Sequence, residues 1–134
     1  MRRFLVLLVV AAAVSCGGDS STSVDVPVIG TYTLRSVNRT PLPFVVAQND
    51  SVKFEIVSDA FTLADDRSWT EAGTSRTTAN GQVSTDPIAR SGTYVLGGGA
   101  RITLISSNGD STDGTIGGGT LTLANEAVVA VYQK

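Results

Sequence analysis

Carboxylates are the main side chains with which this chain could do chemistry, because its 134 residues include 12 Asp and Glu, one Cys and no His. Without histidine the chain lacks the base of Ser-His-Asp and Cys-His catalysis and the commonest metal ligand. Asp65 and Asp66 are adjacent and could form a metal or acid pair, but neighbouring residues of a turn usually point apart. We interpret them as a solvated turn, and we predict a protein that is not an enzyme, with no catalytic residue, metal site or cofactor.

Two other polar or glycine-rich patterns also favour turns over ligand sites. The segment 108–114, Asn-Gly-Asp-Ser-Thr-Asp-Gly, faintly resembles a calcium loop. It departs from the EF-hand pattern because glycine is missing at the sharp turn and Glu126 comes too late. We interpret it as a hairpin turn with Asx caps. The triple glycines 97–99 and 117–119 are followed by neither Lys-Ser, Lys-Thr nor a helix, which excludes a phosphate loop.

Cys16, the only cysteine, stands at the end of an apolar run near the start of the chain. Arg2 and Arg3 precede the run 4–14, and a basic start followed by such a run is typical of a secretory signal peptide. The run is too short to span a bilayer, which takes about 20 apolar residues. Residues 13–16, Ala-Val-Ser-Cys, resemble a bacterial lipobox. The resemblance implies cleavage before Cys16 and lipidation of its thiol and new amine; a plain secretory signal, cut a few residues later, is the alternative.

This interpretation divides the chain into a signal peptide (1–15), a lipidated cysteine with a flexible tether (16–27) and a folded domain (28–134). The tether consists mainly of small polar residues, which cannot bury enough apolar surface to order themselves. By the sorting rule of bacterial lipoproteins, Gly17 after the cysteine favours the outer membrane. We therefore expect a protein of the bacterial cell envelope that is anchored to a membrane through the lipid on Cys16 and faces the periplasm or the exterior.

The charge of the chain argues against nucleic acid as a partner. Loss of Arg2 and Arg3 with the signal peptide leaves eight basic side chains against 12 acidic ones, a net charge of −4. Nucleic-acid binding needs clustered positive charge, and no basic patch is present along the sequence.

Beyond the tether the sequence predicts short strands separated by turns. Apolar and polar residues alternate with period two, and no window shows apolar residues in helical order. The alternation changes parity at Ser58-Asp59, which predicts a bulge or tight turn there. The expected strands are 29–37, 51–57, 60–64, 68–79, 92–96, 100–105, 112–116, 120–124 and 127–133, or eight strands if 51–64 is one bulged strand. The residues expected inside are Tyr32, Leu34, Phe54, Ile56, Tyr94, Leu96, Ile102, Leu104, Leu121 and Leu123.

Short strands at nearly even spacing, with glycine and asparagine turns between them, indicate an antiparallel meander. Closing such a meander removes the exposed edges that invite aggregation. We therefore predict an all-β fold, a small antiparallel up-and-down β-barrel of about eight strands, with an open β-sandwich as the alternative.

Four segments resemble the bacterial lipocalin-like lipoproteins: Gly-Thr-Tyr-Thr-Leu at 30–34, Pro-Leu-Pro-Phe at 41–44, Ser-Gly-Thr-Tyr-Val-Leu at 91–96 and Val-Ala-Val-Tyr at 129–132. In lipocalins a tryptophan of the first strand plugs the closed end of the barrel, and Tyr32 stands at the corresponding place. A basic residue of the last strand often packs on that plug, and the nearest candidate is Lys134. The resemblance implies an eight-stranded cup that holds a small apolar ligand.

The aromatic residues are the candidate ligand-binding residues. Trp69 begins a polar strand, where it either caps one end of the core or forms an aromatic lip at the open mouth. Tyr32 and Tyr94 occupy matched Gly-Thr-Tyr-x-Leu segments, where they either contact a ligand or fill the barrel. Two functions remain open: a membrane-anchored binder of a small hydrophobic ligand, or a non-catalytic structural or partner-binding envelope protein with a solid barrel.

Overall fold

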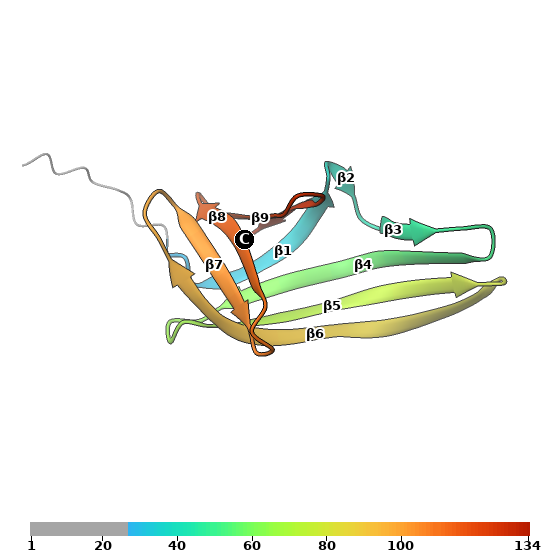
Figure 1. Ribbon diagram of the computed structural model, residues 1–134, viewed down its shortest axis with the longest axis horizontal. Coiled ribbons are helices and arrows are strands. Elements are labelled where there is room, and N and C mark those ends of the chain that lie inside the picture. Colours follow the sequence, from blue (N-terminus) through green and yellow to red (C-terminus); the bar gives the residue numbers. More distant parts are fainter. Residues whose placement is uncertain (1–26) are drawn as a thin grey trace, which may run out of the picture.

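The computed structural model describes residues 27–134, and all regular structure in this part of the chain is β-strand (Figure 1). The predicted signal peptide, the lipidation site Cys16 and all of the predicted tether except Pro27 lie outside the described residues. From residue 27 on, no helix has the length and apolar character needed to cross a membrane. The strands are β1 (Gly30–Val37), β2 (Thr40–Pro41), β3 (Phe44–Gln48), β4 (Val52–Leu63), β5 (Ser68–Ala79), β6 (Gln82–Leu96), β7 (Arg101–Ser106), β8 (Ser111–Gly117), β9 (Thr120–Ala124) and β10 (Val129–Gln133).

Eight of these strands close into an antiparallel up-and-down barrel. Strands β4 to β10 lie side by side in the order of the sequence, and β1 closes the sheet by pairing with both β10 and β4. Along β1 and β4 the register places Gly30 opposite Leu63 and Thr33 opposite Ala60. The predicted barrel is therefore confirmed, and the open β-sandwich is excluded because β1 joins the two ends of the sheet.

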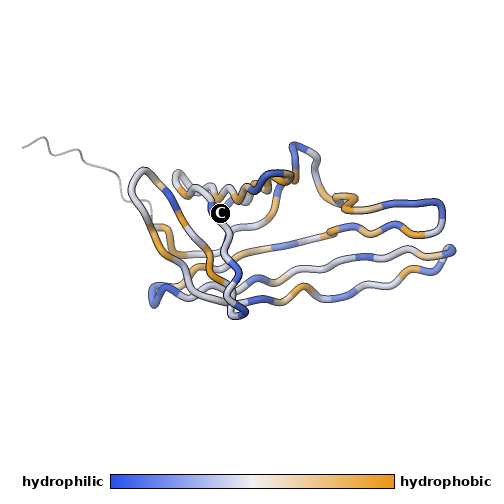
Figure 2. Tube along the Cα trace, in the orientation of Figure 1, coloured by the Kyte–Doolittle hydropathy of each residue, from blue (hydrophilic) through white to orange (hydrophobic). Residues whose placement is uncertain are grey.

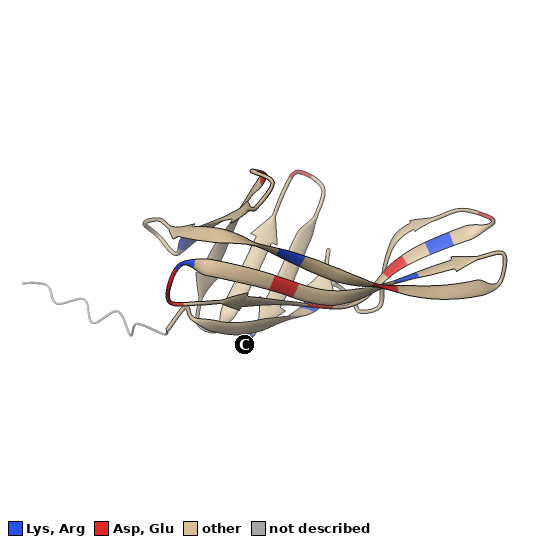
Figure 3. Ribbon diagram, turned by 90° about the horizontal axis from the view of Figure 1, so that it is seen from below, with Lys and Arg blue, Asp and Glu red and all other residues tan. Residues whose placement is uncertain are grey.

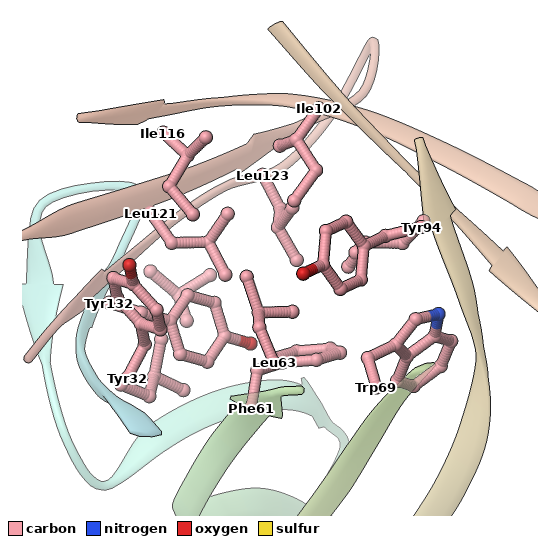
Figure 4. Packing of buried hydrophobic residues seen from close by; sticks show 13 residues of the cluster. Tyr32, Phe61, Leu63, Trp69, Tyr94, Ile102, Ile116, Leu121, Leu123 and Tyr132 are labelled. Carbon is pink, nitrogen blue, oxygen red and sulfur yellow. The ribbon is translucent and has the colours of Figure 1, made fainter. Parts of the chain in front are cut away.

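The barrel core is formed by side chains that alternate along each strand. Seven of the ten residues expected inside are buried, and Ile56 and Leu96 are partly buried against the core. Phe54 is also partly buried but is not part of the core cluster. The full set of buried apolar residues is Tyr32, Leu34, Val37, Phe61, Leu63, Trp69, Tyr94, Ile102, Leu104, Ile116, Leu121, Leu123 and Tyr132 (Figure 4).

Strands β4, β5 and β6 continue beyond the barrel and form an arm, which we define as residues 44–57 and 74–87 (Figures 1 and 3). In the arm β4 pairs with β3 instead of β1. Strand β6 remains paired with β5 over its whole length there, whereas β7 joins it only from Gly92 on. Figure 2 shows hydrophobic positions in the barrel and also along β3 and the outer part of β4, while β5 and the outer part of β6 are mostly pale or hydrophilic.

The arm explains where the sequence-based strand limits were wrong. The strand predicted at 92–96 begins ten residues earlier, at Gln82, and β2 and β3 were not predicted. Residues 82–86 are exposed and polar except for Val83, so they show no inward apolar set; in the arm they face no core. The bulge predicted at Ser58-Asp59 is confirmed: the pairing of β4 with β5 shifts between Ile56 and Ser58, so the odd-numbered residues from Asp59 to Leu63 point into the barrel.

Candidate functional site

One end of the barrel is closed by aromatic side chains whose polar atoms all have partners. The Tyr32 hydroxyl donates to the carbonyl of Val28 at 2.7 Å, and the Tyr94 hydroxyl donates to that of Ala64 at 2.6 Å. Lys134 Nζ lies 5.5 Å from the centre of the Tyr32 ring and donates to the carbonyls of Pro27 and Ile29. We call this the closed end.

We call the opposite end, at the β7–β8 and β9–β10 turns, the mouth. It contains a half-open cavity of about 200 Å³. Three aromatic residues, Phe61, Trp69 and Tyr132, form one wall. The Phe61 ring centre lies 5.3 Å from that of Trp69 and 5.2 Å from that of Tyr132 (Figure 4). The rest of the lining comprises Glu71, Arg90, Leu104, Ser106, Thr112, Leu123, Ala124, Asn125, Val128 and Ala130. Polar and apolar groups thus share the lining about equally, and a concave site in which a few polar groups converge beside an aromatic wall can orient a small molecule.

Glu71 and Arg90 form a cross-strand ion pair in this cavity. They stand opposite each other on β5 and β6, and Arg90 Nη2 donates to Glu71 Oε1 at 2.8 Å. Glu71 Oε2 lies 2.5 Å from Arg90 Nε without a well-directed hydrogen bond. The Glu71 side chain is only 2% exposed, whereas that of Arg90 is 64% exposed. The carboxylate is therefore fixed in the wall, and the guanidinium covers it from the solvent side.

Asp59 lies beside this pair, at the point where the arm leaves the barrel. It is 5% exposed, and its Oδ2 accepts a 2.8 Å hydrogen bond from the Tyr132 hydroxyl. Asp59 Oδ1 is buried and has no hydrogen-bond partner among residues 27–134. Gly73 stands opposite Asp59, and a Cβ there would lie 2.4 Å from the Ser58 carbonyl oxygen and 2.8 Å from Asp59 Oδ1. Glycine at position 73 is thus needed for β5 to lie this close to Asp59.

The two buried carboxyl groups alter the protonation of the site. Burial, followed by the charge of Glu71, raises the pKa of Asp59 from 3.8 to about 7, although the Tyr132 hydrogen bond acts in the opposite direction. The carboxyls of Asp59 and Glu71 are close enough to hydrogen-bond to each other when one is protonated. Burial also raises the pKa of Tyr132, with the Asp59 charge as the second cause. Near neutral pH Asp59 therefore exchanges its proton with solvent.

A second carboxylate–arginine pair, in the arm, behaves differently. Glu55 stands opposite Arg76 and lies 2.8 Å from its Nη2, and Lys53 Nζ lies 3.1 Å from the other carboxylate oxygen. Hydrogen bonds from Lys53 and Arg76 lower the pKa of Glu55. Because two cations stabilise its ionised form, Glu55 serves as the reference carboxylate with which the site at Glu71 is compared.

The structure separates the three aromatic residues predicted to bind a ligand. Trp69 lines the mouth cavity, but as a buried wall residue and not as an exposed lip; its Nε1 donates to the Thr93 carbonyl at 2.9 Å. Tyr32 and Tyr94 lie at the closed end, where their hydroxyls bond to main-chain carbonyls. Asp66 caps the β4–β5 turn by accepting from the Ser68 main-chain nitrogen at 2.9 Å, as expected of a solvated turn.

Sequence reasoning missed the charged residues of the mouth. Asp59 shares the inward parity of Phe61 and Leu63, and Glu71 shares that of Trp69. A charged residue at an inward position of a strand was therefore the available signal, since such residues are rarely buried without a partner. Arg90 gave no signal, because it belongs to the part of β6 that was not predicted as a strand.

Comparison with known proteins finds no matching family model, no similar curated protein and no similar solved structure. Within the described range, no group of three or more Cys, Asp or Glu side chains is arranged to hold a metal ion. What the protein does is therefore inferred from its own residues.

Proposed function

We propose that this protein is a membrane-anchored, lipocalin-like binding protein that holds a small hydrophobic ligand in the mouth of its barrel. The half-open cavity of about 200 Å³ with its aromatic wall carries this proposal. An apolar cavity of about 150 Å³ accepts benzene, so the mouth has room for a compact ring. A long acyl chain does not fit, because side chains such as Leu63 and Leu121, both 0% exposed, fill the interior behind the cavity.

The closed end supports the lipocalin-like part of the proposal. Tyr32 fills this end from the first barrel strand, and Lys134, just after the last strand, lies over its ring. This is the arrangement of plug and basic residue that the resemblance implies, with tyrosine in place of tryptophan. The eight-stranded up-and-down closure is a second point of agreement.

The lipobox-like segment supports the anchor, and mutation of Cys16 tests it. Buried acyl chains contribute about 0.8 kcal/mol per methylene, so two or more chains hold a protein stably on a membrane. In a bacterial host the unaltered chain should fractionate with membranes, and Cys16→Ser should be released or remain unprocessed. Membrane association of Cys16→Ser at the mature mass would contradict the anchor while leaving the cavity proposal intact.

Trp69 offers a direct test of the ligand site, because it is the single tryptophan of the chain and lines the cavity. Small aromatic compounds added to the purified protein should change its fluorescence saturably. Ala130→Phe places a ring in the cavity and should abolish that response. Ala89→Phe, on an exposed position of β6, is the matched control and should retain it. A flat response from the unaltered protein would remove the binding proposal.

The arm favours a second candidate, a partner-binding role. Val45, Val46 and Val52 lie at or near the tip of the β3–β4 hairpin, and Val83 lies near that of β5–β6; all four are exposed, Val83 by 64%. Scattered apolar residues on a projecting hairpin suit contact with another protein. Replacing Val45 and Val83 by threonine should leave the Trp69 response unchanged, and a loss of partners in cross-linking on intact cells would favour this function over ligand binding.

A further inference from the structure

Glu71 and Arg90 line the mouth cavity, and a second buried acid, Asp59, lies behind the lining beside Glu71. Asp59 and Glu71 are each at most 5% exposed. The cation Arg90 contacts Glu71 directly. Asp59 Oδ1 is left without a hydrogen-bond partner among the described residues. When both acids are ionised, their two negative charges are balanced by Arg90 alone, and a neutral apolar ligand does nothing to balance the second charge. A ligand that brings positive charge into the cavity does.

We propose that the ligand of the mouth is a small apolar amine in its protonated form, whose ammonium group binds the carboxylate of Glu71. The apolar body of the amine packs against the wall of Phe61, Trp69 and Tyr132, whose aromatic rings also attract a cation. This inference rests on the proposed function and names the chemical class of its ligand.

Charge balance links binding of the amine to release of a proton. Asp59 is faced by Glu71 from β5 and by Tyr132 from β10, and Arg90 of β6 pairs with Glu71 on its other side. In the empty site one proton on the carboxyl pair and the charge of Arg90 neutralise both acids. When the ammonium enters, its charge replaces that of the proton, which leaves Asp59 for solvent. The site is electrically neutral before and after binding.

The same geometry disfavours an anionic ligand. An anion that approached Arg90 in the cavity would meet the Glu71 carboxylate 2.5 Å from the guanidinium, with Asp59 beside it. The Arg90 side chain is mostly exposed to solvent, whereas Glu71 is buried in the wall. The buried charge on the cavity wall is therefore the carboxylate of Glu71.

Three probes of similar shape test the proposal on the purified full chain: 2-phenylethylamine, 2-phenylethanol and 3-phenylpropanoate, each followed by Trp69 fluorescence at pH 6 and pH 8. An alkylammonium stays charged across this range. Because the Asp59 pKa is about 7, the ionised fraction rises roughly tenfold between the two pH values, and the Kd of the amine should fall by about the same factor. The alcohol should bind more weakly and with no change between pH 6 and pH 8. Calorimetry at pH 7 in two buffers of different ionisation enthalpy should show proton release with the amine alone.

Matched variants separate the charge from the shape of the cavity. Asp59→Asn keeps an acceptor for Tyr132 but cannot ionise, so it should remove the pH dependence of amine binding. Glu71→Gln should abolish the preference for amine over alcohol. Glu55→Gln, which removes the arginine-paired carboxylate of the arm, should leave affinity and pH dependence as they are.

The outcomes distinguish this inference from the function on which it rests. Equal binding of amine and alcohol with no pH dependence would overturn the amine proposal and retain a hydrophobic site. Preferential binding of 3-phenylpropanoate would also overturn it, by making Arg90 the anchor. If no probe binds at either pH, both proposals fail. Tighter binding of the amine at pH 8, with proton release, supports both.

Discussion

The closed end and the mouth of the barrel both contain buried tyrosines, but the hydroxyl groups of these tyrosines have different hydrogen-bond partners. At the closed end the hydroxyls of Tyr32 and Tyr94 find main-chain carbonyls, and Lys134 and Arg67 lie over their rings. At the mouth the Tyr132 hydroxyl donates to the buried carboxyl group of Asp59, whose other oxygen has no hydrogen-bond partner among residues 27–134. Completed hydrogen bonds suit a structural role, whereas an incomplete set next to open space suits binding.

The largest difference between the two ends should appear when a leucine is shortened. Leu121 is fully buried in the filled part of the barrel, and Leu121→Ala should lower the free energy of unfolding by about 2–5 kcal/mol because a new cavity forms. Leu123→Ala, whose side chain already borders the mouth cavity, should cost less. Urea denaturation measures both, and equal losses would show that the mouth is packed as tightly as the interior.

The next effect concerns the dependence of stability on pH. The Asp59 pKa is raised from 3.8 to about 7 on folding, so the unfolded chain releases this proton at a lower pH than the folded chain does. The contribution is stabilising below about pH 4 and is lost as the pH rises through 7. Relative to Asp59→Asn, the unaltered protein should lose roughly 3 kcal/mol of unfolding free energy between pH 5 and pH 8, at about 1.4 kcal/mol per pKa unit.

The opposite sign is expected of Glu55 in the arm. Its pKa is lowered by Lys53 and Arg76, so its contribution to stability is present above the ordinary pKa of a glutamate and is lost on acidification. Urea titrations of the unaltered protein, Asp59→Asn and Glu55→Gln across this pH range separate the two effects. Parallel curves for all three proteins would contradict the assigned protonation of the mouth.

A smaller effect is expected from a methyl group placed against Asp59. Gly73→Ala brings a Cβ to within 3 Å of the Ser58 carbonyl and Asp59 Oδ1, which should cost about 1–3 kcal/mol through displacement of β4 from β5. Gly98→Ala, with no atom within 4 Å of its Cβ, is the control and should be nearly neutral. Thermal denaturation of the two variants shows whether the close approach at the mouth is as tight as described.

The smallest effect is expected at the closed end. Tyr94→Phe removes one hydroxyl but leaves the ring in place, so it should cost about 0.5–1.5 kcal/mol, the usual net value of one hydrogen bond. It should not alter the binding of any ligand at the mouth. A change in the Trp69 response to ligand in Tyr94→Phe would show that the two ends are coupled.

The sequence predicted the barrel well because alternation and turn residues are local signals. Asn80-Gly81 both have positive φ, as the two-residue hairpin turn requires, and Asn125 caps its own turn by accepting from Ala127 and Val128. The parts of β4 and β5 in the arm were predicted as strands, but the outer part of β6 was not, because positions such as Ser84 and Asp86 face no core and carry no apolar pattern.

The site was harder to predict than the fold, since its residues meet only through tertiary pairing. Asp59, Glu71, Arg90 and Tyr132 come from four strands, and the register of β4, β5 and β6 with the closure by β10 brings them together. Trp69 was singled out and does line the cavity. Its acidic neighbours Asp59 and Glu71 lie in ordinary strand sequences. Only the placement of a charged residue at an inward position distinguishes them.

The most direct test of the contrast between the two ends is the titration of the carboxyl groups by carbon-13 NMR. The side-chain carboxyl signals of Asp59, Glu71 and Glu55 are followed from pH 3 to pH 9 in the purified protein. A titration of Asp59 centred near pH 7, with Glu55 titrating below the ordinary pKa of a glutamate, is the predicted result. Titration of Asp59 below pH 5 would contradict the raised pKa of this buried carboxyl group, on which the account of the mouth depends.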